Sequence, residues 1–307
     1  MMFATRIYAR LYTIADVGVR RCAVLVCMIA GLVHSAHAAV ICSGSVNLNP
    51  VTYSATSATI ATGSVDVSCT RSSPAEVVNL AGNGYNVLAG IGSVSYNLGA
   101  DGGNVGTTIA VSGINQLDYD LLRSPGFSSD WSTGSVMAGS VTFGLFDLTS
   151  NTSTTNFQMQ VPTGRWTSPP GTYTELVTVF INHGTQTEQT TFTTTVQVNA
   201  ACMFPVAPSD VNFGAYNSLA SGVATTASSG FQVLCSQGVP ISLVFDPASS
   251  SVLGLTYSLS LNPASGVVSL GSNTAFTING SMAAGQAGTC NTAVCVGSQP
   301  RSITLSY

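Results

Sequence analysis

The feature that most constrains this fold is an alternation of apolar and polar residues with a period of two, which recurs along nearly the whole chain. Val65, Val67 and Cys69 are the apolar members of one such alternating segment. The alternating segments are 65–69, 94–98, 177–181, 192–198, 231–235, 241–245, 257–261 and 303–307. They are rich in β-branched and aromatic residues and are separated by Gly, Ser, Asn and Pro, while helical patterns are nearly absent. The sequence therefore predicts an all-β protein whose short strands pack as β-sandwiches.

The N-terminus has the order of a secretory signal. Arg6, Arg10, Arg20 and Arg21 precede an apolar run that ends in small residues up to Ala38. A helix needs about 20 apolar residues to span a bilayer, and this run is shorter. We therefore expect a signal peptide over 1–38 rather than a membrane anchor. The mature chain would then be exported.

The charged residues are few and argue against a nucleic-acid partner. The chain has 8 basic and 12 acidic side chains, and all the basic ones are arginine. Only Arg71, Arg123, Arg165 and Arg301 follow the expected signal. Binding to phosphates needs clustered Lys and Arg, so no nucleic-acid partner is expected. A hydrophobic content of 45% also disfavours a disordered chain.

The cysteines indicate disulfides. Two of the 8 cysteines, Cys22 and Cys27, lie in the expected signal, and an even number remains in an exported chain. Of the possible pairings, the spacing favours Cys42–Cys69, Cys202–Cys235 and Cys290–Cys295. The first two would each close a loop of about 30 residues, worth roughly 3–4 kcal/mol on a chain-entropy model. Zinc binding is the alternative, but the sequence contains no Cys-x-x-Cys pair, so we expect neither a metal nor a cofactor.

The two halves of the chain resemble each other. Residues 42–69 and 202–235 each run from a cysteine, through a stretch of small residues, to an alternating strand that ends in a second cysteine. The join between the halves is polar. We expect an N-terminal domain over 39–184, a linker over 185–191 and a C-terminal domain over 192–307, in which Phe192 to Val198 would form the first strand.

Several short motifs resemble the spore coat protein U domain, the subunit fold of archaic chaperone–usher pili. In the second half the matching segments are Phe213 to Tyr216, Cys235 and Ile303 to Tyr307. In the first half they are Tyr119 to Leu122, Trp131, Val161-Pro162 and Gly171 to Val179. The chain departs from the family pattern at Glu175, where the family has Asp, in the Cys290–Cys295 pair, in the lack of an Arg-Met segment in the second half and in an insertion over 75–91.

This resemblance implies two tandem immunoglobulin-like pilin sandwiches. It also implies three partners: an adjacent pilin subunit that donates a strand, a periplasmic chaperone and an outer-membrane usher. The chain would pass through the periplasm to the cell surface.

The ends of the chain suggest a position in such a fibre. Tyr307 stands inside the last expected strand, and too few strands follow Cys202 to complete a seven-stranded sandwich. We therefore expect an incomplete C-terminal domain with an acceptor edge, although a six-stranded sandwich stays an alternative. Cys42 follows the expected cleavage point closely, which leaves no segment to donate and favours the pilus tip. The expected acceptor residues are Phe192, Val196, Val198, Ile303, Leu305 and Tyr307.

Catalysis is disfavoured. Beyond the signal the sequence has one histidine, His183, and its surroundings offer no nucleophile elbow. Asp118 and Asp120 stand two apart on an expected strand, where a solvated face is the better interpretation than an acid–base pair. Residues 101–104 are interpreted as a turn rather than a calcium loop. The chain is therefore not expected to be an enzyme.

Large apolar side chains in expected loops of the first half are candidate surface contacts. They are Val87, Leu88, Ile91, Phe127, Trp131, Val136, Met137 and Trp166. For Trp131, packing over the end of the sandwich is an equal alternative. These residues lead to the hypothesis of a pilus tip adhesin that attaches cells to abiotic or host surfaces and supports biofilm formation.

Two alternatives stay open. A lectin-like tip would stack Trp131 or Trp166 on a sugar and bind its hydroxyls through Asp118, Asp120 or Asn104. A structural coat or fibre subunit would have no adhesive role.

Overall fold

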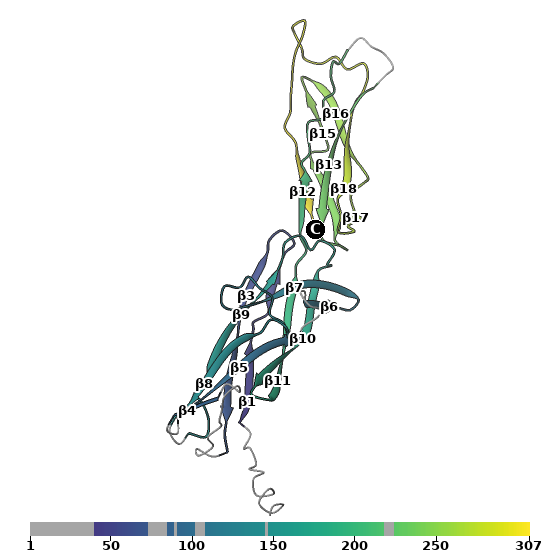
Figure 1. Ribbon diagram of the computed structural model, residues 1–307. Helices are drawn as coiled ribbons and strands as arrows, with labels where there is room; N and C mark the ends of the chain where they lie inside the picture. The colour runs from purple at the N-terminus through teal and green to yellow at the C-terminus, as the bar shows by residue number, and fades with distance from the viewer. Residues whose placement is uncertain (1–39, 73–84, 89–90, 102–107, 145–146, 218–223) are drawn as a thin grey trace, which may run out of the picture.

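The computed structural model describes residues 40–72, 85–88, 91–101, 108–144, 147–217 and 224–307. The expected signal peptide and most of the 101–104 turn lie outside these ranges. Figure 1 shows two elongated β bodies stacked end to end, which we call the first and second halves. Every regular element in the described ranges is a strand, so the predicted all-β fold is confirmed. The same residues contain no helix long and apolar enough to cross a membrane.

The first half contains β1 to β11. Their bounds are β1 Ile41–Asn47, β2 Val51–Tyr53, β3 Thr59–Thr70, β4 Tyr85–Leu88, β5 Ile91–Asp101, β6 Thr108–Ser112, β7 Asn115–Arg123, β8 Met137–Phe143, β9 Ser153–Val161, β10 Gly171–His183 and β11 Gln186–Val198. They form one curled sheet in the order β1-β3-β9-β7-β6-β10-β11-β2, from which β5 branches at β10 and carries β4 and β8.

The alternation along these strands produces one core. On β3 the side chains of Val65, Val67 and Cys69 are fully buried, while their neighbours in sequence are more exposed. Gly63 on the same strand faces the ring of Phe157, and an added Cβ would lie 2.3 Å from its Cζ. A glycine is therefore required there, because the aromatic ring occupies the space that a side chain would take.

The segment expected to be a linker is part of a long hairpin instead. β10 and β11 pair along their whole length, from Gly171 opposite Val198 to His183 opposite Gln186. Gly184, with φ of 53°, permits the tight turn between them. The expected boundary at 185–191 is therefore wrong, and the first half continues to Val198.

The same hairpin corrects three of the expected acceptor residues. Phe192, Val196 and Val198 are buried in the core of the first half, and β11 also pairs in parallel with β2, with Val196 opposite Val51. They cannot line an edge of the second half. The first half is closed by a strand of its own chain, and the connection to the second half is the short segment 199–201.

The second half contains β12 to β19. Their bounds are β12 Cys202–Val206, β13 Thr225–Cys235, β14 Pro240–Asp246, β15 Ser249–Val252, β16 Leu255–Asn262, β17 Val267–Val268, β18 Thr274–Met282 and β19 Ser302–Ser306. A five-stranded sheet, β12-β13-β18-β16-β15, faces a smaller sheet, β17-β14-β19. Between them lies a second core that includes Phe231, Val233, Ile241, Leu243 and Phe276.

The motif at 213–216 covers part of this second core. A Cβ on Gly280 of β18 would lie 2.5 Å from Cζ of Phe213, so the phenyl ring fills the hollow above this glycine. The hydroxyl of Tyr216 donates to the carbonyl oxygen of Ala283 at 2.8 Å and accepts from the N–H of Gln286. The segment thus covers Gly280 of β18 and binds the backbone that follows this strand.

All three expected disulfides are confirmed. Cys42 bonds to Cys69, Cys202 to Cys235 and Cys290 to Cys295. The first two link the opposite members of paired strands, β1 with β3 and β12 with β13.

Candidate binding surfaces

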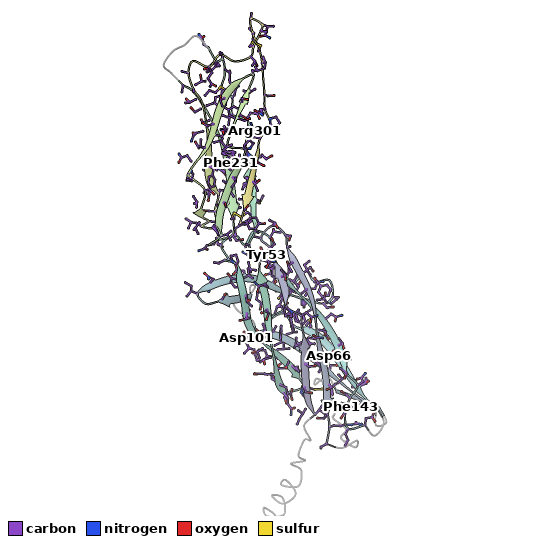
Figure 2. All side chains as sticks on the ribbon, turned by 180° about the vertical axis from the view of Figure 1, so that it is seen from behind. Tyr53, Asp66, Asp101, Phe143, Phe231 and Arg301 are labelled. Carbon is purple, nitrogen blue, oxygen red and sulfur yellow. A yellow bond between two sulfur atoms is a disulfide. The ribbon has the colours of Figure 1, made fainter. Side chains whose placement is uncertain are left out.

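Arg71 organises the end of the first half that lies farthest from the second half, which we call the distal end; Phe143 marks it in Figure 2. The buried guanidinium of Arg71 donates from Nε to the carbonyl oxygen of Asp147 at 2.7 Å and from Nη2 to that of Gly144 at 3.1 Å. It also lies 4.8 Å from the centre of the Phe143 ring. One side chain therefore holds the backbone carbonyls of Gly144 and Asp147 beside the end of β8.

Two exposed apolar side chains lie at the distal end. Ile41 is opposite Thr70 on β1, and Leu148 accepts a hydrogen bond from the N–H of Arg71 through its carbonyl oxygen, at 2.8 Å. Their exposed fractions are 57% and 49%. Sequence reasoning did not single out Ile41, Arg71 or Leu148. Leu148 lies between β8 and β9, and Ile41 stands beside a cysteine within β1, where the sequence gave no loop signal.

Part of the expected apolar contact set belongs to the same end. β4 and β5 form a hairpin with Leu88 opposite Ile91 and Val87 opposite Gly92. Figure 1 places β4 at the distal end. The backbone positions of Val87, Leu88 and Ile91 are described, whereas their side chains lie outside the described part of the chain.

Trp131 and Met137 are corrections to the expected contact set. Both are buried in the first core, and the indole Nε1 of Trp131 donates to the carbonyl oxygen of Leu98 at 2.9 Å. The indole ring lies 4.9 Å from that of Phe157. Trp131 therefore adopts the alternative position, inside the sandwich, because its ring and its N–H both find partners there. Phe127 and Val136 are half-buried in the loop between β7 and β8.

Trp166 also lies elsewhere than the sequence analysis predicted. It packs against the first core, and its carbonyl oxygen accepts a hydrogen bond from Gln237 of the second half at 2.8 Å. It therefore lies at the junction of the two halves, opposite to the distal end. The expected contact residues do not form one patch, and only the β4–β5 hairpin remains at the distal end.

Two of the polar candidates, Asp118 and His183, pair with side chains of the first half itself. Asp118 forms an ion pair with Arg165, with 3.2 Å between Oδ2 and Nη1. The pKa of Asp120 is raised, mainly by partial burial and then by the charges of Asp130 and Asp118, while Arg165 acts in the opposite direction. His183 Nε2 lies 2.6 Å from Oε2 of Glu188 across the hairpin turn. Across the described ranges, no three His, Cys, Asp or Glu residues gather as a metal site.

Glu175, the departure from the family pattern, is used inside the fold. Its carboxylate accepts a hydrogen bond from the hydroxyl of Tyr119, which also lies 3.0 Å from Oγ1 of Thr194. Tyr119 and Thr194 are fully buried. The glutamate therefore satisfies a buried hydroxyl between β7, β10 and β11.

Among the described strands of the second half, β12, β15, β17 and β19 are each paired on one side only. β12 pairs only with β13, and β19 pairs only with β14, with Leu305 opposite Leu243 and Ile303 opposite Phe245. Ile303 and Leu305 face the second core but are half-buried, and Phe204 of β12 is half-buried as well. Tyr307 is exposed beyond the end of β19.

The chain is similar to a known family and, more distantly, to solved fimbrial structures. Residues 32–180 match the model of the Spore Coat Protein U domain. No curated protein sequence matches the chain. The chaperone–tip adhesion subunit complex CsuC–CsuE of Acinetobacter baumannii is 12% identical, with a TM-score of 0.44, over 86% of this chain and 100% of that chain.

Two other fimbrial structures are similar to smaller parts of the chain. AggA, the major subunit of aggregative adherence fimbriae type I of Escherichia coli, is 14% identical, with a TM-score of 0.28, over 52% of this chain and 96% of that chain. A chaperone–tip adhesin complex of CFA/I fimbriae is 10% identical, with a TM-score of 0.29, over 68% and 84%. These likenesses are too low to carry an argument about function.

The family match covers most of the first half, from before β1 into β10. It is a match to a coat-protein domain rather than to an enzyme family, which agrees with the expectation that the chain is not an enzyme. Residues 32–180, just under half of the chain, are similar to the Spore Coat Protein U domain family.

Proposed function

We propose that this chain is a subunit of a chaperone–usher pilus and that its second half accepts a strand from an adjacent subunit. One observation carries the proposal: the edge of β19 is unpaired among the described strands, while Ile303 and Leu305 on it face a core that covers them only in part. An added strand would pair with this edge through its backbone and insert alternate side chains over the core.

The contrast between the two cores supports this role. In the first half, which its own β11 closes, Val65, Val67 and Ile181 are fully buried. In the second half several inward residues are only half-buried: Phe204, Phe245, Leu259, Leu261, Ile303 and Leu305. Burial of one such side chain contributes about 1.5–3 kcal/mol, so covering a few of them is comparable to the stability of a whole domain, about 5–15 kcal/mol.

A strand supplied in cis tests the acceptor edge. An alternating Val–Thr strand, joined after Tyr307 of the whole mature chain through a short flexible linker, should protect the amides of β19 and β12 from hydrogen exchange. The control is a strand of the same composition with its valines in adjacent pairs, which cannot present one apolar face. Equal protection with both strands, or strong protection of β19 without any added strand, would contradict the proposal.

In the fibre we place this chain at the tip, with the first half as the adhesive part. This placement is supported by the completion of the first half through its own β11, so that it requires no strand from a neighbour. The adhesive surface would be the distal end, where Ile41 and Leu148 are exposed and where the β4–β5 hairpin also lies. Burying a few hundred Å² of apolar surface there would contribute several kcal/mol at about 25 cal/mol per Å². Many tips on one cell would add avidity, which is how surface attachment and biofilm formation follow.

A matched pair of variants tests the adhesive surface. Ile41→Ser with Leu148→Ser should weaken attachment to hydrophobic plastic. Ile60→Ser should not, since Ile60 is exposed to the same degree, 58% against 57% for Ile41, but lies near the opposite end of β3. Attachment that both variants retain would favour a non-adhesive fibre subunit. Attachment that a free sugar abolishes would favour a lectin.

Assembly would require two further partners. A periplasmic chaperone would cover the open edge before assembly, and an outer-membrane usher would exchange it for the strand of the adjacent subunit. Without a cover, an unpaired strand edge pairs with other chains. Deleting the chaperone should therefore cause loss of the exported chain by aggregation or proteolysis. Normal accumulation would argue against this route.

A further inference from the structure

The loop that precedes β19 carries exposed apolar side chains and is cross-linked by a disulfide bond. We call residues 289–299 the disulfide knob. The Cys290–Cys295 bond closes it, and Val294 and Val296 on either side of Cys295 are 80% and 93% exposed. The knob contains no charged residue. An uncharged apolar projection of this kind is typical of a contact surface.

The knob is attached to the sheet beneath it. The N–H of Thr289 donates to the carbonyl oxygen of Leu253 at 2.7 Å. Gly297 lies so close to the same turn that an added Cβ would be 2.8 Å from Cγ of Leu253 and 2.8 Å from Cγ2 of Val252. Inside the ring, the hydroxyl of Thr292 donates to the carbonyl oxygen of Val294 at 2.9 Å. The two valines are therefore held in place instead of folding back onto the protein.

The position of the knob is linked to the acceptor edge. From Gln299 the chain continues through Arg301, whose Nε donates to the hydroxyl of Tyr257 at 2.6 Å, directly into β19. Figure 1 places the C-terminus at the junction of the two halves, and Figures 1 and 2 both place the yellow-green loop region of the second half at the end away from the junction. β19 therefore runs from the knob end toward the first half.

This direction leaves one end free for a partner. The first half occupies the junction end of the second half, where Gln237 meets Trp166. A subunit whose strand lies along β19 must therefore place its body at the knob end. The inference below rests on the proposed function for that strand.

We propose that the disulfide knob is a second contact for the adjacent fibre subunit, the one whose strand occupies the edge of β19. Val294 and Val296 bind an apolar, uncharged hollow on the body of that subunit. The disulfide keeps the two valines apart and prearranged, which reduces the entropy lost on association. The strand supplies most of the binding free energy, and the disulfide knob fixes the orientation of the two subunits relative to each other.

Photo-cross-linking from the whole chain during fibre assembly tests the proposal. Benzoylphenylalanine replaces Val296 in one variant, Thr304 of β19 in a second and Leu270 in a control. Leu270 is 76% exposed but follows Ser269, whose carbonyl oxygen accepts from Gly238 near the junction. We expect the same polypeptide to be linked from Val296 and Thr304 and not from Leu270.

The outcomes separate the two proposals. If Thr304 links a fibre subunit while Val296 links nothing, or links the chaperone or usher instead, the knob proposal falls and the acceptor edge stands. If neither position links a fibre subunit, both fall.

Substitutions give an independent measurement. Val294→Ser with Val296→Ser should make the adjacent subunit dissociate about tenfold faster from the purified complex, because contact substitutions act mainly on dissociation. Val268→Ser is the matched control, an exposed valine on β17. Cys290→Ser with Cys295→Ser should act in the same direction as the valine pair. Unchanged dissociation in both knob variants would overturn the proposal, provided that melting curves show the second half folded.

Discussion

The backbone N–H of Gln237 donates a hydrogen bond of 2.8 Å to the carbonyl oxygen of Trp166, and this bond joins the two halves of the chain. The chain itself connects them at residues 199–201, where the N–H of Asn199 donates to Tyr53 and that of Ser236 to Ala201. Gly271, with φ of 75°, lies against the same backbone, and an added Cβ would be 2.7 Å from the Trp166 oxygen. The junction is therefore a packed surface as well as a peptide connection.

Opening of the junction is the first prediction. Gly271→Ala should separate the halves, because the new methyl group would meet backbone atoms that cannot rotate away. Limited proteolysis within 199–201 should become faster. Gly285→Ala is the control, because Gly285 has nearly the same φ, 72°, and open space around it. Both variants share the cost of a left-handed alanine, about 1 kcal/mol. Equal proteolysis of the two variants would show that the contact does not hold the halves together.

Loss of stability at the distal end is the second prediction. Arg71→Ala would remove two part-buried hydrogen bonds from a charged donor to the carbonyl oxygens of Gly144 and Asp147, which together should contribute about 1–3 kcal/mol. The free energy of unfolding in urea should fall by an amount in that range. Arg71→Lys should recover only part of it, since an ammonium group lacks the planar fork of the guanidinium. Full recovery with lysine would indicate that charge alone matters.

The third prediction concerns the disulfides. Because all six described cysteines are paired, a chain that begins at Ala39, without Cys22 and Cys27, should show no free thiol to a thiol reagent when unfolded and unreduced. The Cys42–Cys69 bond, with a sequence separation of 27, should contribute roughly 3–4 kcal/mol on the chain-entropy model. The Cys290–Cys295 bond, with a separation of 5, should contribute about 2 kcal/mol. Paired Cys→Ser variants compared by urea unfolding measure both. A greater loss for the second pair would contradict the model.

The fourth prediction concerns Asp120 and pH. Its pKa in the folded protein is raised above the ordinary value of 3.8, chiefly by partial burial. The folded state therefore binds this proton more tightly than the unfolded state. As the pH rises from 3.8 through the higher pKa of the folded state, ionisation of this carboxyl lowers the free energy of unfolding. Asp120→Asn should raise the Tm at neutral pH, and the gain should disappear below about pH 3.8, where both states are protonated.

Thermal melts at several pH values check this result. Asp118→Asn is the comparison, because it removes the ion pair with Arg165 and should give no such gain. A Tm that does not change with Asp120→Asn at neutral pH would show that the carboxyl is fully solvated.

The sequence by itself determined the class of fold, the eight strands with clear alternation and the covalent links. The alternation at Val65, Val67 and Cys69 predicts that these side chains share one face of the sheet, because the side-chain period of a strand is two. The spacing of the cysteines predicted the three disulfide pairs. Two of these disulfides link residues that lie directly opposite each other on antiparallel strands.

Only the tertiary structure decided which sheet each strand joins and what covers each large side chain. The alternation of Phe192, Val196 and Val198 fits either half equally well, and the full-length pairing with β10 places them in the first core. Trp131 and Trp166 both stand between strands in the sequence, yet one lies inside the sandwich and the other at the junction. Local sequence cannot distinguish these positions, because burial depends on partners far away along the chain, such as Leu98 for Trp131 and Gln237 for Trp166.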